Sequence, residues 1–553
     1  MSDAALLYRR YCREGFDEHG VLNSFEPVIP ETFNFAYDVV DEIARIEPER
    51  RAMVWCNEAG EERFFTFRDL KRESDKAANL LASLGIAKGD KVMLILKRHY
   101  QFWTAILALH KLGATAIPGT HLLTEKDILY RFKLAGVKGI ICTSEGETTR
   151  FVDEACAEYH GLKCKLTVRG EKPGWLDFDK LTAGADEELA RVPTTVDIGM
   201  LGYFTSGTTG YPKLVVHDHS YAVAHIITAR YWHNVDPDGL HLTVSDTGWG
   251  KAAWGKLYGQ WFCGAGIFVF DFEKFDAAAL MNRIEKYRIT TFCAPPTIYR
   301  FLVKEGMEGH DLSSIRYATT AGEALNPEVF NRFKEYTGLE LMEGFGQTET
   351  TLTLANLVGS RPKPGSMGKP SPLYPGLSLV DEDGHEVANG VVGEIVLRTR
   401  PGSRQAGLFQ GYYRNEELTR EVWHDNLYHT GDTAWRDENG YFWYVGRTDD
   451  VIKSSGYRIG PFEIESVLME HPAVLECAVT GAPDPVRGIV VKATIVLTSS
   501  YSPSDALKKE LQNYVKKQTA PYKYPRIVEF VEELPKTISG KIRRTEIRQK
   551  DNG

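Results

Sequence analysis

Apolar and polar positions follow two different rhythms in the first third of the chain. Residues 35–46 and 66–85 place apolar side chains three and four positions apart, which predicts amphipathic helices. Residues 90–96 and 136–144 are nearly continuous apolar runs, with a helical pattern between them at 100–113. Uniformly apolar strands that alternate with helices are typical of a parallel sheet covered by helices on both faces.

The same rhythm returns later in the chain and then changes. An apolar run at 264–271 is followed by a helical pattern at 275–289 and by a further strand and helix at 290–302. Between residues 364 and 443 the runs are shorter, rich in glycine and separated by turn residues, which indicates small antiparallel strands. We therefore expect two parallel-sheet units and then an antiparallel region.

The last hundred residues have a pattern of their own. Residues 461–472 and 504–518 are helical in pattern, and residues 474–483 and 490–497 are strand-like. This α+β arrangement is the right size for a small domain. The prediction is an N-terminal domain over residues 1–447 and a C-terminal domain over residues 448–553.

Length and charge narrow the function classes. A chain of 553 residues is longer than a single hydrophobic core normally supports, which agrees with several domains. The formal net charge of −9 gives no support for nucleic-acid binding. No apolar run approaches the roughly 20 residues needed to cross a bilayer. The first twenty residues carry acidic side chains and no long apolar core, so we predict neither a signal nor a transit peptide.

The eight cysteines are scattered and include no CxxC pair. This spacing argues against a disulfide framework and against a structural zinc site. A reduced, cytoplasmic location is the natural expectation.

The first candidate for chemistry is the segment YFTSGTTGYPK, residues 203–213. Small residues let backbone N–H groups converge on an anion, hydroxyl groups add donors, and Lys213 supplies a positive charge. No GK[ST] ends the segment, so it is not a Walker A loop. Taken alone, such a segment of serine, threonine and glycine favours a polar surface turn over a phosphate site.

The second candidate is MEGFGQTET, residues 342–350. Its Gly–Phe–Gly core permits close backbone approach to a flat ligand. Glu349 could hold a divalent metal beside phosphates, because Mg²⁺ takes one or two carboxylates together with phosphate oxygens. The alternative is a turn with an exposed acidic end.

Three further segments each contain candidate residues. YHTGDTAW places Asp432 after a glycine, where it could accept hydrogen bonds from ribose hydroxyls or simply belong to a turn. GRTDDVIKSSGYRIGPFEIES contains Arg447, Asp449 and Arg458. LPKTISGKIRR presents Lys541 after a glycine, and the plain alternative is a solvated charge.

In this order and at these spacings, the five segments resemble the signatures of the adenylate-forming superfamily, which includes acyl-CoA synthetases, nonribosomal-peptide adenylation domains and luciferases. The match spans residues 65–544, and SSGYRIGPFEIES and TAPYKYPR resemble the medium-chain acyl-CoA synthetases most. The resemblance implies a large N-terminal domain with two parallel-sheet (αβαβα-like) subdomains and a small β-barrel. A mobile α+β C-terminal domain would follow.

The resemblance also implies an ATP site assembled from distant segments. The loop around the phosphates would comprise Thr205, Ser206, Gly207, Thr208, Thr209, Gly210 and Lys213. Contacts to adenine and the α-phosphate would come from Gly322, Glu323, Ala324, Glu343, Gly344, Phe345, Gly346, Gln347 and Thr348, with alanine at 324 where many relatives have proline. Asp432 matches the ribose-binding acid, Arg447 and Arg458 match nucleotide contacts, and Glu349 and Thr208 are the candidate Mg²⁺ ligands.

The remaining substrates have candidate residues of the same origin. The coenzyme A contacts of the family fall on Ser455, Gly456, Tyr457, Arg487 and Lys516. The acyl pocket would include Trp249, Cys293 and Gly346. Core packing explains Trp249 equally well, and Cys293 is expected to be a core residue rather than a nucleophile. Acetate-specific relatives carry tryptophan where this chain has Gly346, which implies a deeper pocket for a medium-chain, branched or aryl acid.

The implied reaction has two halves. A carboxylic acid attacks the α-phosphate of ATP to give acyl-AMP and pyrophosphate, and the coenzyme A thiolate then displaces AMP. The resemblance implies that Lys541 promotes the first half, that Lys213 holds the leaving pyrophosphate with Mg²⁺, and that the C-terminal domain rotates about Asp449 between the halves.

Three other functions are less consistent with these residues. The main alternative is acyl transfer to a carrier protein instead of coenzyme A. A regulatory nucleotide-binding protein is disfavoured by the joint presence of Lys541, Asp449 and Glu349, and a Walker-type kinase by the missing GK[ST]. The predicted partners are the small-molecule acid, ATP and coenzyme A. The oligomeric state, a homo-oligomer included, is left open.

Overall fold

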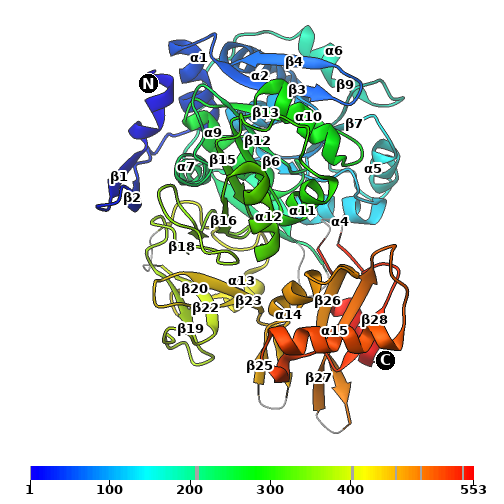
Figure 1. Cartoon of the computed structure of the whole chain (residues 1–553). Coiled ribbons are helices and arrows are strands. Elements are labelled where there is room, and N and C mark those ends of the chain that lie inside the picture. The colour runs from blue at the N-terminus through cyan, green and yellow to red at the C-terminus, as the bar shows by residue number, and fades with distance from the viewer. Residues whose placement is uncertain are drawn as a thin grey trace.

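The computed structural model describes residues 2–205, 211–399, 404–454, 457–485, 488–537 and 541–552, without the side chains of Arg458 and Asn552. Figure 1 shows a large α/β body, a smaller antiparallel sheet below it, and the C-terminal α+β unit beside that sheet.

A seven-stranded sheet forms the first half of the α/β body. Its strand order is β11-β10-β6-β5-β7-β8-β9, and every pairing is parallel except that of β10 with β11. Its strands are β5 (Lys91–Ile95), β6 (Thr115–Pro118), β7 (Gly139–Thr143), β8 (Cys164–Val168), β9 (Leu176–Asp177), β10 (Gly199–Thr205) and β11 (Lys213–Asp218). Its helices are α2 (Phe67–Ser83), α3 (Gln101–Leu112), α4 (Glu125–Ala135), α5 (Thr148–Cys156) and α6 (Phe178–Ala183).

A nine-stranded sheet of order β18-β17-β16-β15-β14-β12-β13-β3-β4 forms the second half. The central strands β16, β15, β14, β12, β13 and β3 are parallel. The strands are β3 (Arg51–Asn57), β4 (Glu62–Thr66), β12 (Leu240–Thr243), β13 (Gly266–Asp271), β14 (Thr291–Ala294), β15 (Tyr317–Thr320), β16 (Leu341–Phe345), β17 (Leu354–Ala355) and β18 (Lys369–Pro370). The helices are α7 (Ser220–Ile226), the π-helix η3 (Ile227–Trp232), α8 (Gly250–Gly255), α9 (Tyr258–Phe262), α10 (Ala277–Tyr287), α11 (Pro296–Glu305) and α12 (Pro327–Thr337).

These two sheets confirm the predicted parallel-sheet units. The central strands β5 and β7 are buried along almost their whole length, which explains their continuous apolar sequence. Helix α2 begins with a capping box in which Thr66 and Asp69 satisfy each other's backbone N–H groups. Helix α3 is buried on all sides and ends at Gly113, whose φ of 68° suits a left-handed C-cap.

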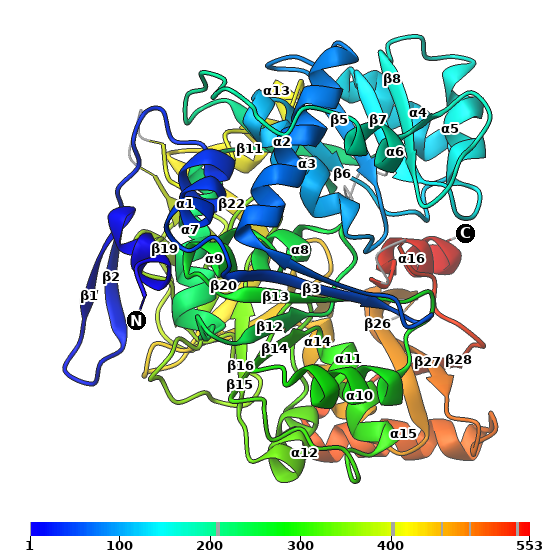
Figure 2. The same cartoon turned by 90° about the horizontal axis from the view of Figure 1, so that it is seen from above.

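The N-terminal segment lies along one side of the body. It contains η1 (Ala4–Arg10), β1 (Cys12–Phe16), β2 (Leu22–Pro27), the π-helix η2 (Ala36–Asp41) and α1 (Glu42–Ile46). Strands β1 and β2 form an antiparallel hairpin that projects from the side of the molecule in Figure 2.

The antiparallel region is a five-stranded sheet in which β19, β20, β22 and β21 are neighbours and β23 pairs with β22. A closed small β-barrel is therefore not confirmed. Short strands separated by turns predict antiparallel pairing but do not distinguish an open sheet from a ring. The elements are β19 (Leu377–Val380), β20 (Gly393–Arg398), α13 (Glu416–Val422), β21 (Trp423–His424), β22 (Leu427–Arg436) and β23 (Phe442–Arg447).

The C-terminal unit has its own hydrophobic core, in which Ile464, Leu468, Ala493, Leu511 and Val515 are buried together. Strands β26 and β27 are antiparallel, and β28 joins β27 in parallel. The elements are β24 (Ile452–Ser454), β25 (Tyr457–Ile459), α14 (Pro461–Met469), β26 (Val474–Asp484), β27 (Gly488–Leu497), α15 (Asp505–Gln518), η4 (Pro521–Lys523), β28 (Ile527–Phe530) and α16 (Arg544–Asn552).

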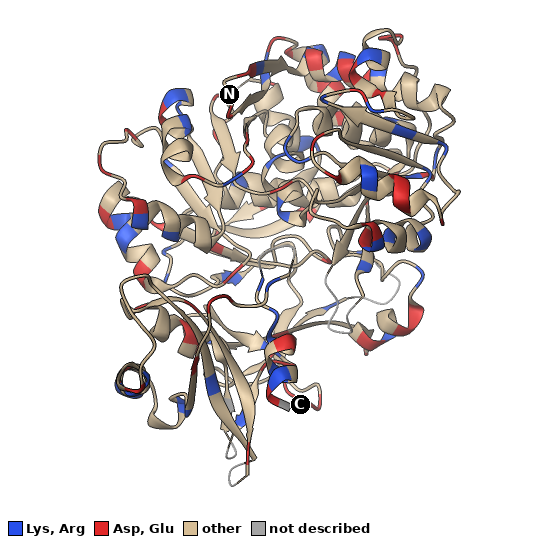
Figure 3. Cartoon of the chain, turned by 90° about the vertical axis from the view of Figure 1, so that its right-hand side faces the viewer, with Lys and Arg blue, Asp and Glu red and all other residues tan. Residues whose placement is uncertain are grey.

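Figure 3 colours the charged residues on the ribbon: residues of both signs are interspersed along the surface helices, and the strands of the sheets carry few of them. Among the described helices, none combines the length and the apolar character that a membrane crossing requires.

Candidate active site

The predicted phosphate loop joins two paired strands. Thr205 at the end of β10 lies opposite Lys213 at the start of β11. Ser206, Gly207, Thr208, Thr209 and Gly210 lie outside the described residues. On the far side of the loop, the ring of Tyr211 stacks on that of Tyr130, with 5.3 Å between centroids, and the Tyr130 hydroxyl donates to the Pro212 carbonyl.

Lys213 faces the acidic end of the second motif. Its ammonium lies 4.9 Å from the centre of the Tyr412 ring, and the Tyr412 hydroxyl donates to Oε1 of Glu349 at 2.8 Å. Burial lowers the pKa of Lys213, and the Glu349 carboxylate opposes this shift. Burial likewise raises the pKa of Glu349, against the Tyr412 hydrogen bond and the charge of Lys213. A lysine and a carboxylate are thus held side by side in a partly desolvated place.

The Gly–Phe–Gly segment at the end of β16 packs against two indole rings. A Cβ added to Gly344 would lie 2.7 Å from the Trp232 ring, and one added to Gly346 would lie 2.5 Å from the Trp254 ring and 2.2 Å from the Thr351 carbonyl. Both positions therefore require glycine because of the protein behind them. The indole of Trp254 fills the space next to Gly346.

Gln347 connects the second motif to the third. Its amide donates to the Thr430 carbonyl at 2.8 Å and to Asp432 at 2.5 Å, and its own oxygen accepts from the Tyr428 hydroxyl at 2.7 Å. Thr348 is held from behind, because its carbonyl accepts a 2.7 Å hydrogen bond from Nε2 of the buried His217. These three hydrogen bonds hold the Gln347 amide in one orientation and connect the second motif to the segment that contains Asp432.

Asp432 is a buried acid with several polar neighbours. The Tyr444 hydroxyl donates to its Oδ1 at 3.1 Å, and the Arg447 guanidinium lies 3.6 Å from its Oδ2. Burial raises the pKa of Asp432, opposed by Arg447 first and more weakly by Lys541. Lys541, on the C-terminal unit, is therefore within electrostatic reach of this acid.

The predicted hinge follows directly. Arg447 donates to the Thr430 carbonyl at 2.8 Å, and its Nε lies 3.6 Å from the exposed Asp449. Arg447 thus lies beside both Asp432, the predicted ribose-binding acid, and Asp449, the predicted hinge residue.

The predicted adenine segment follows β15. Gly322 has a φ of 106°, and the exposed Glu323 accepts a 2.8 Å hydrogen bond from Thr297. The neighbouring Ala324 is half-buried and precedes Leu325, whose N–H donates to Oε1 of Glu343 at 3.3 Å. Burial raises the pKa of Glu343 to about 8, and its Oε2 has no hydrogen-bond partner in the described structure. Glu343 is thus a buried acid, protonated at neutral pH, beneath the segment.

The predicted acyl residues lie around the start of α8 and the end of β14. Trp249 is half-buried and immediately precedes α8, whereas Cys293 is 1% exposed. Lys251, two residues after Trp249, donates to the Ala321 carbonyl at 2.5 Å, and burial lowers its pKa. Lys251 was not predicted as a site residue, although the segment GWGKAAWG that contains it was noticed.

The predicted coenzyme A residues lie elsewhere. Ser455, Gly456 and Arg487, like the side chain of Arg458, fall outside the described residues. Tyr457 stacks on Tyr522 with 4.0 Å between ring centroids.

Lys516 lies 5.5 Å from the centre of the Tyr524 ring. Figure 1 places β25, which carries Tyr457, at the lower end of the C-terminal unit, away from the two parallel sheets. The structure therefore brings Lys541, and not Tyr457, to the nucleotide motifs.

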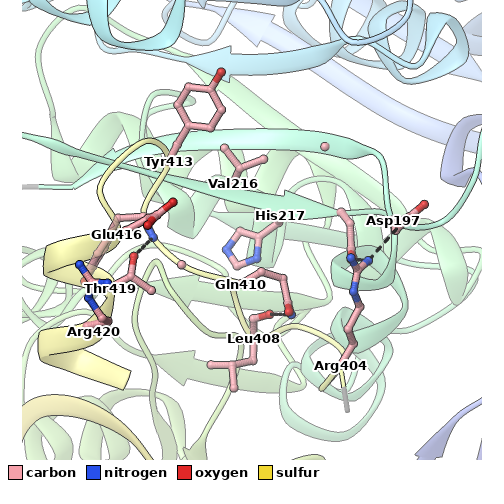
Figure 4. Close-up of a pocket in the computed structure, with 14 residues that line it drawn as sticks. Asp197, Val216, His217, Arg404, Leu408, Gln410, Tyr413, Glu416, Thr419 and Arg420 are labelled. Atoms are coloured by element: carbon pink, nitrogen blue, oxygen red, sulfur yellow. Dashed lines mark hydrogen bonds and ion pairs between the residues drawn. The ribbon is translucent and has the colours of Figure 1, made fainter. Parts of the chain in front are cut away.

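A cavity of about 500 Å³ lies behind His217. Figure 4 shows its lining, in which Arg404 reaches toward Asp197, and Glu416 and Arg420 come from α13. Tyr412 also lines it, and the Tyr412 hydroxyl donates to Glu349, so one side chain contacts both the cavity and the carboxylate beside Lys213.

Several residues of the site had no motif to reveal them. Tyr412, Tyr444, Trp232 and Trp254 act through contacts between segments that are distant in sequence. Tyr444 was only one of several aromatic residues in a strand pattern, and nothing local marked Tyr412.

Fold and site together define an ATP-dependent enzyme that activates carboxylic acids as adenylates. Two family profiles match the chain: "AMP-binding enzyme" over residues 40–413 and "AMP-binding enzyme C-terminal domain" over residues 463–541. The chain belongs to the AMP-binding enzyme family.

Curated relatives carry this further. The chain is 45% identical to the mitochondrial acyl-coenzyme A synthetase ACSM5 of Homo sapiens over 536 residues, which cover 95% of this chain and 92% of that protein. It is 42% identical to the mitochondrial acyl-coenzyme A synthetase ACSM3 of Mus musculus over 555 residues, covering 98% and 95%. The predicted class, an AMP-forming acyl-CoA synthetase, is confirmed.

Solved structures agree in fold. The anthranilate CoA ligase AuaEII in complex with anthranoyl-AMP superposes with a TM-score of 0.85 at 29% identity, covering 95% of this chain and 98% of that one. A benzoate CoA ligase from Burkholderia xenovorans LB400 superposes with a TM-score of 0.80 at 28% identity, covering 93% and 100%.

The expectation of a cytoplasmic location is contradicted. It rested on unpaired cysteines and on an N-terminus without an evident leader pattern. The curated relatives that match nearly the whole chain are named as mitochondrial proteins. Cysteines without disulfide bonds are compatible with both the cytoplasm and the mitochondrial interior, so they do not distinguish the two compartments.

Proposed function

We propose that this enzyme joins a medium-chain, branched or aryl carboxylic acid to coenzyme A, and that the motif residues divide the work as follows. The observation that carries the proposal is the convergence of Lys213, Gln347, Glu349, Asp432 and Arg447 on one place, with Lys541 reaching it from the C-terminal unit. These residues come from separate segments, and a set of turns without a shared ligand would have no reason to meet.

Asp432 receives the ribose of ATP. It already accepts from Gln347 and Tyr444, and its ionised form is favoured by Arg447, so it is a fixed acceptor ready for a sugar hydroxyl. Glu343 has a free oxygen beneath the adenine segment and is suited to bond a purine nitrogen. Phe345, next to Tyr444 at 6.3 Å, provides a ring for stacking.

Lys213 and Glu349 hold the phosphates. Lys213 offers a cation to the leaving pyrophosphate. Glu349 fits Mg²⁺ because Tyr412 binds only its Oε1, which leaves a carboxylate oxygen for a metal that prefers oxygen ligands. When bound, Mg²⁺ would neutralise charge on the phosphates. Thr208, the second proposed ligand, lies in the phosphate loop.

Lys541 promotes acyl-AMP formation. The reaction brings a carboxylate onto a polyanion, so a cation between the two lowers the barrier more than a base would. In the described structure the Lys541 ammonium has no hydrogen-bond or ion-pair partner, and it is free to meet the carboxylate and α-phosphate oxygens. Loss of a preorganised donor of this kind costs about 10²–10³ in rate.

The second half-reaction uses another orientation of the C-terminal domain, residues 448–553. Rotation about Asp449 would withdraw Lys541 and bring strands β24 and β25, with Tyr457, to the acyl-AMP, a hinge motion of a known type. Coenzyme A would then contact Ser455, Gly456, Tyr457, Arg487 and Lys516, and its thiolate would displace AMP.

The acyl pocket is bounded by Trp249, Cys293 and the turn at Gly346. Because the Trp254 indole occupies the space beside Gly346, the depth of the pocket is set by Trp254 as much as by the missing side chain at 346. A tryptophan at 346 would collide with the Thr351 carbonyl, so the acetate-type closure does not fit this backbone.

The test is a panel of C2–C12, branched and aromatic acids, with AMP release measured with and without coenzyme A. We expect turnover to be highest with an acid longer than acetate, with one AMP per acid consumed. Lys541→Ala should lower acyl-AMP formation at least 100-fold, whereas Lys550→Ala, an exposed lysine of the same unit, should leave it unchanged. Acetate as the best substrate, or undiminished adenylation in Lys541→Ala, would overturn the corresponding assignment.

A further inference from the structure

The segment that carries Lys541 is folded back on itself. The Thr537 N–H donates to the Lys541 carbonyl at 2.7 Å, the Lys541 N–H donates to the Thr537 hydroxyl at 3.1 Å, and the Arg543 N–H donates to the Pro535 carbonyl at 2.8 Å. At the base of this turn, the Lys536 ammonium contacts both oxygens of Glu476 on β26, at 2.8 and 2.7 Å. These contacts pair the described residues on the two sides of positions 538–540, but they do not by themselves fix where Lys541 stands relative to the rest of the C-terminal unit.

Arg544 makes that connection. It is the first residue of α16, three positions after Lys541, and its Nη2 donates to both carboxylate oxygens of Glu465, at 2.8 and 2.7 Å. Its Nη1 lies 3.6 Å from Asp450, and Arg548 contacts the same aspartate. The guanidinium therefore joins the start of α16 to α14 and to the segment that follows Asp449.

The contacts of Glu465 make this connection stiff. Its side chain is 10% exposed, and Oε1 also accepts a 2.8 Å hydrogen bond from the Val479 N–H on β26. Burial lowers the pKa of Arg544, but the charges of Glu465 and Asp450 more than reverse the shift. A bidentate, desolvated arginine–carboxylate pair has both directional and energetic specificity.

The same arginine faces the nucleotide site. Tyr444 on β23 is near enough for the Arg544 charge to act on it, and the Tyr444 hydroxyl donates to Asp432. The Tyr444 ring also contacts Phe462 of α14 edge-on, with 6.1 Å between centroids. Arg544 thus lies where the C-terminal unit meets Tyr444, the tyrosine that donates to Asp432. In this orientation of the C-terminal unit, Lys541 is within electrostatic reach of Asp432.

We propose that Arg544, through its fork to Glu465 and Asp450, is a positioning residue for acyl-AMP formation that sets where Lys541 stands over the nucleotide. Arg544 does not touch substrate; it acts through Lys541. This inference rests on the proposed role of Lys541. Because the second half-reaction withdraws Lys541, the fork matters for adenylation and not for thioester formation.

The experiment separates the two half-reactions in the full-length enzyme. Acyl-AMP formation is measured as acid-dependent pyrophosphate release without coenzyme A, and thioester formation is measured from synthetic hexanoyl-AMP, or the adenylate of whichever acid the panel selects, with coenzyme A. We expect Arg544→Met and Glu465→Gln to slow adenylation 10- to 100-fold, because misplacing a reacting group by about 1 Å costs about 10²-fold. Thioester formation should change less than threefold.

A double-variant cycle distinguishes positioning from general support of the fold. In a Lys541→Ala background, Arg544→Met should slow adenylation less than twofold further, since there is no ammonium left to position. Arg544→Lys, which keeps the charge and loses the fork, should fall between the wild type and Arg544→Met. It also keeps the test available if Arg544→Met fails to fold. Arg543→Met is the matched control, because among the described residues the side chain of the neighbouring Arg543 makes only an exposed 3.7 Å contact with Glu546.

Each outcome is decisive. Equal loss in both half-reactions, no loss in either, or a full further loss in the Lys541→Ala background would overturn the positioning role. If Lys541→Ala itself leaves adenylation intact, the proposed function of Lys541 fails instead, and the cycle reports that separately.

Discussion

His217 offers a sharp pH-dependent test of how the segment around Thr348 is supported. Its imidazole is 3% exposed, stacks on Tyr221 with 4.0 Å between centroids, and donates from Nε2 to the Thr348 carbonyl at 2.7 Å. Burial lowers its pKa from 6.5 to about 4, so the folded protein holds it neutral. The perturbation is His217→Gln, studied at pH 7 and at pH 5.

The sign follows from the depressed pKa. Above pH 6.5 the imidazole is neutral in both states and its full stabilisation is present. As the pH falls from 6.5 toward 4, His217 becomes protonated in the unfolded chain but stays neutral in the folded chain, so the free energy of unfolding decreases. At pH 5 the loss covers about 1.5 pH units at about 1.4 kcal/mol each, or about 2 kcal/mol. The glutamine variant has no such loss.

The assay is urea unfolding of wild type and variant at both pH values. The destabilisation caused by His217→Gln should be smaller at pH 5 than at pH 7 by about 2 kcal/mol, while other titrating groups cancel in the comparison. Tyr221→Phe is the control, because it alters the ring against His217 without adding or removing a group that titrates between these pH values. A cost of His217→Gln that is equal at the two pH values, or larger at pH 5, would refute the buried neutral imidazole.

Two further predictions concern the substrates. Trp254→Leu should raise the ratio of kcat/KM for a long acid over a short one at least tenfold, because it opens space beside Gly346; an unchanged ratio in the acid panel would place the pocket elsewhere. Tyr412→Phe removes the hydroxyl that holds Oε1 of Glu349 and should raise the Mg²⁺ concentration for half-maximal activity about 10-fold, as loss of a group that orients a metal ligand typically does. The KM for the acid should stay constant, and an unaltered Mg²⁺ titration would contradict the metal role of Glu349.

The parallel-sheet body could be predicted because its signal is local. A strand buried on both faces is apolar throughout, and a helix beside it repeats every three to four residues, so β5, α3 and β7 were visible within short windows. Whether the antiparallel strands after them close into a ring depends on pairing between distant segments, and the barrel expected there was not confirmed.

The motif residues could also be recognised within short segments of sequence, whereas the residues that contact them could not. Tyr412 lies 63 positions from the carboxylate to which it donates, and Trp232 lies 110 positions from its acceptor at Met342. No pattern within one segment encodes such contacts. They arise when the two sheets and the antiparallel region assemble.

The glycines of the second motif are required for a reason that the sequence alone does not show. Gly344 and Gly346 were attributed to close approach of a flat ligand, but each lies against an indole on the protein side. The sequence marks where a side chain is not tolerated. Only the packed structure shows that Trp232 and Trp254 are what excludes it.

The most direct test of the account follows the oxygen atoms of the acid. The proposed first step is attack of a carboxylate oxygen on the α-phosphate of ATP, and displacement by coenzyme A then leaves that oxygen on AMP. With an acid labelled with ¹⁸O in both carboxylate positions, mass spectrometry should find one ¹⁸O in each AMP released, and none in pyrophosphate. Unlabelled AMP, or formation of ADP with the label in inorganic phosphate, would contradict the acyl-adenylate mechanism.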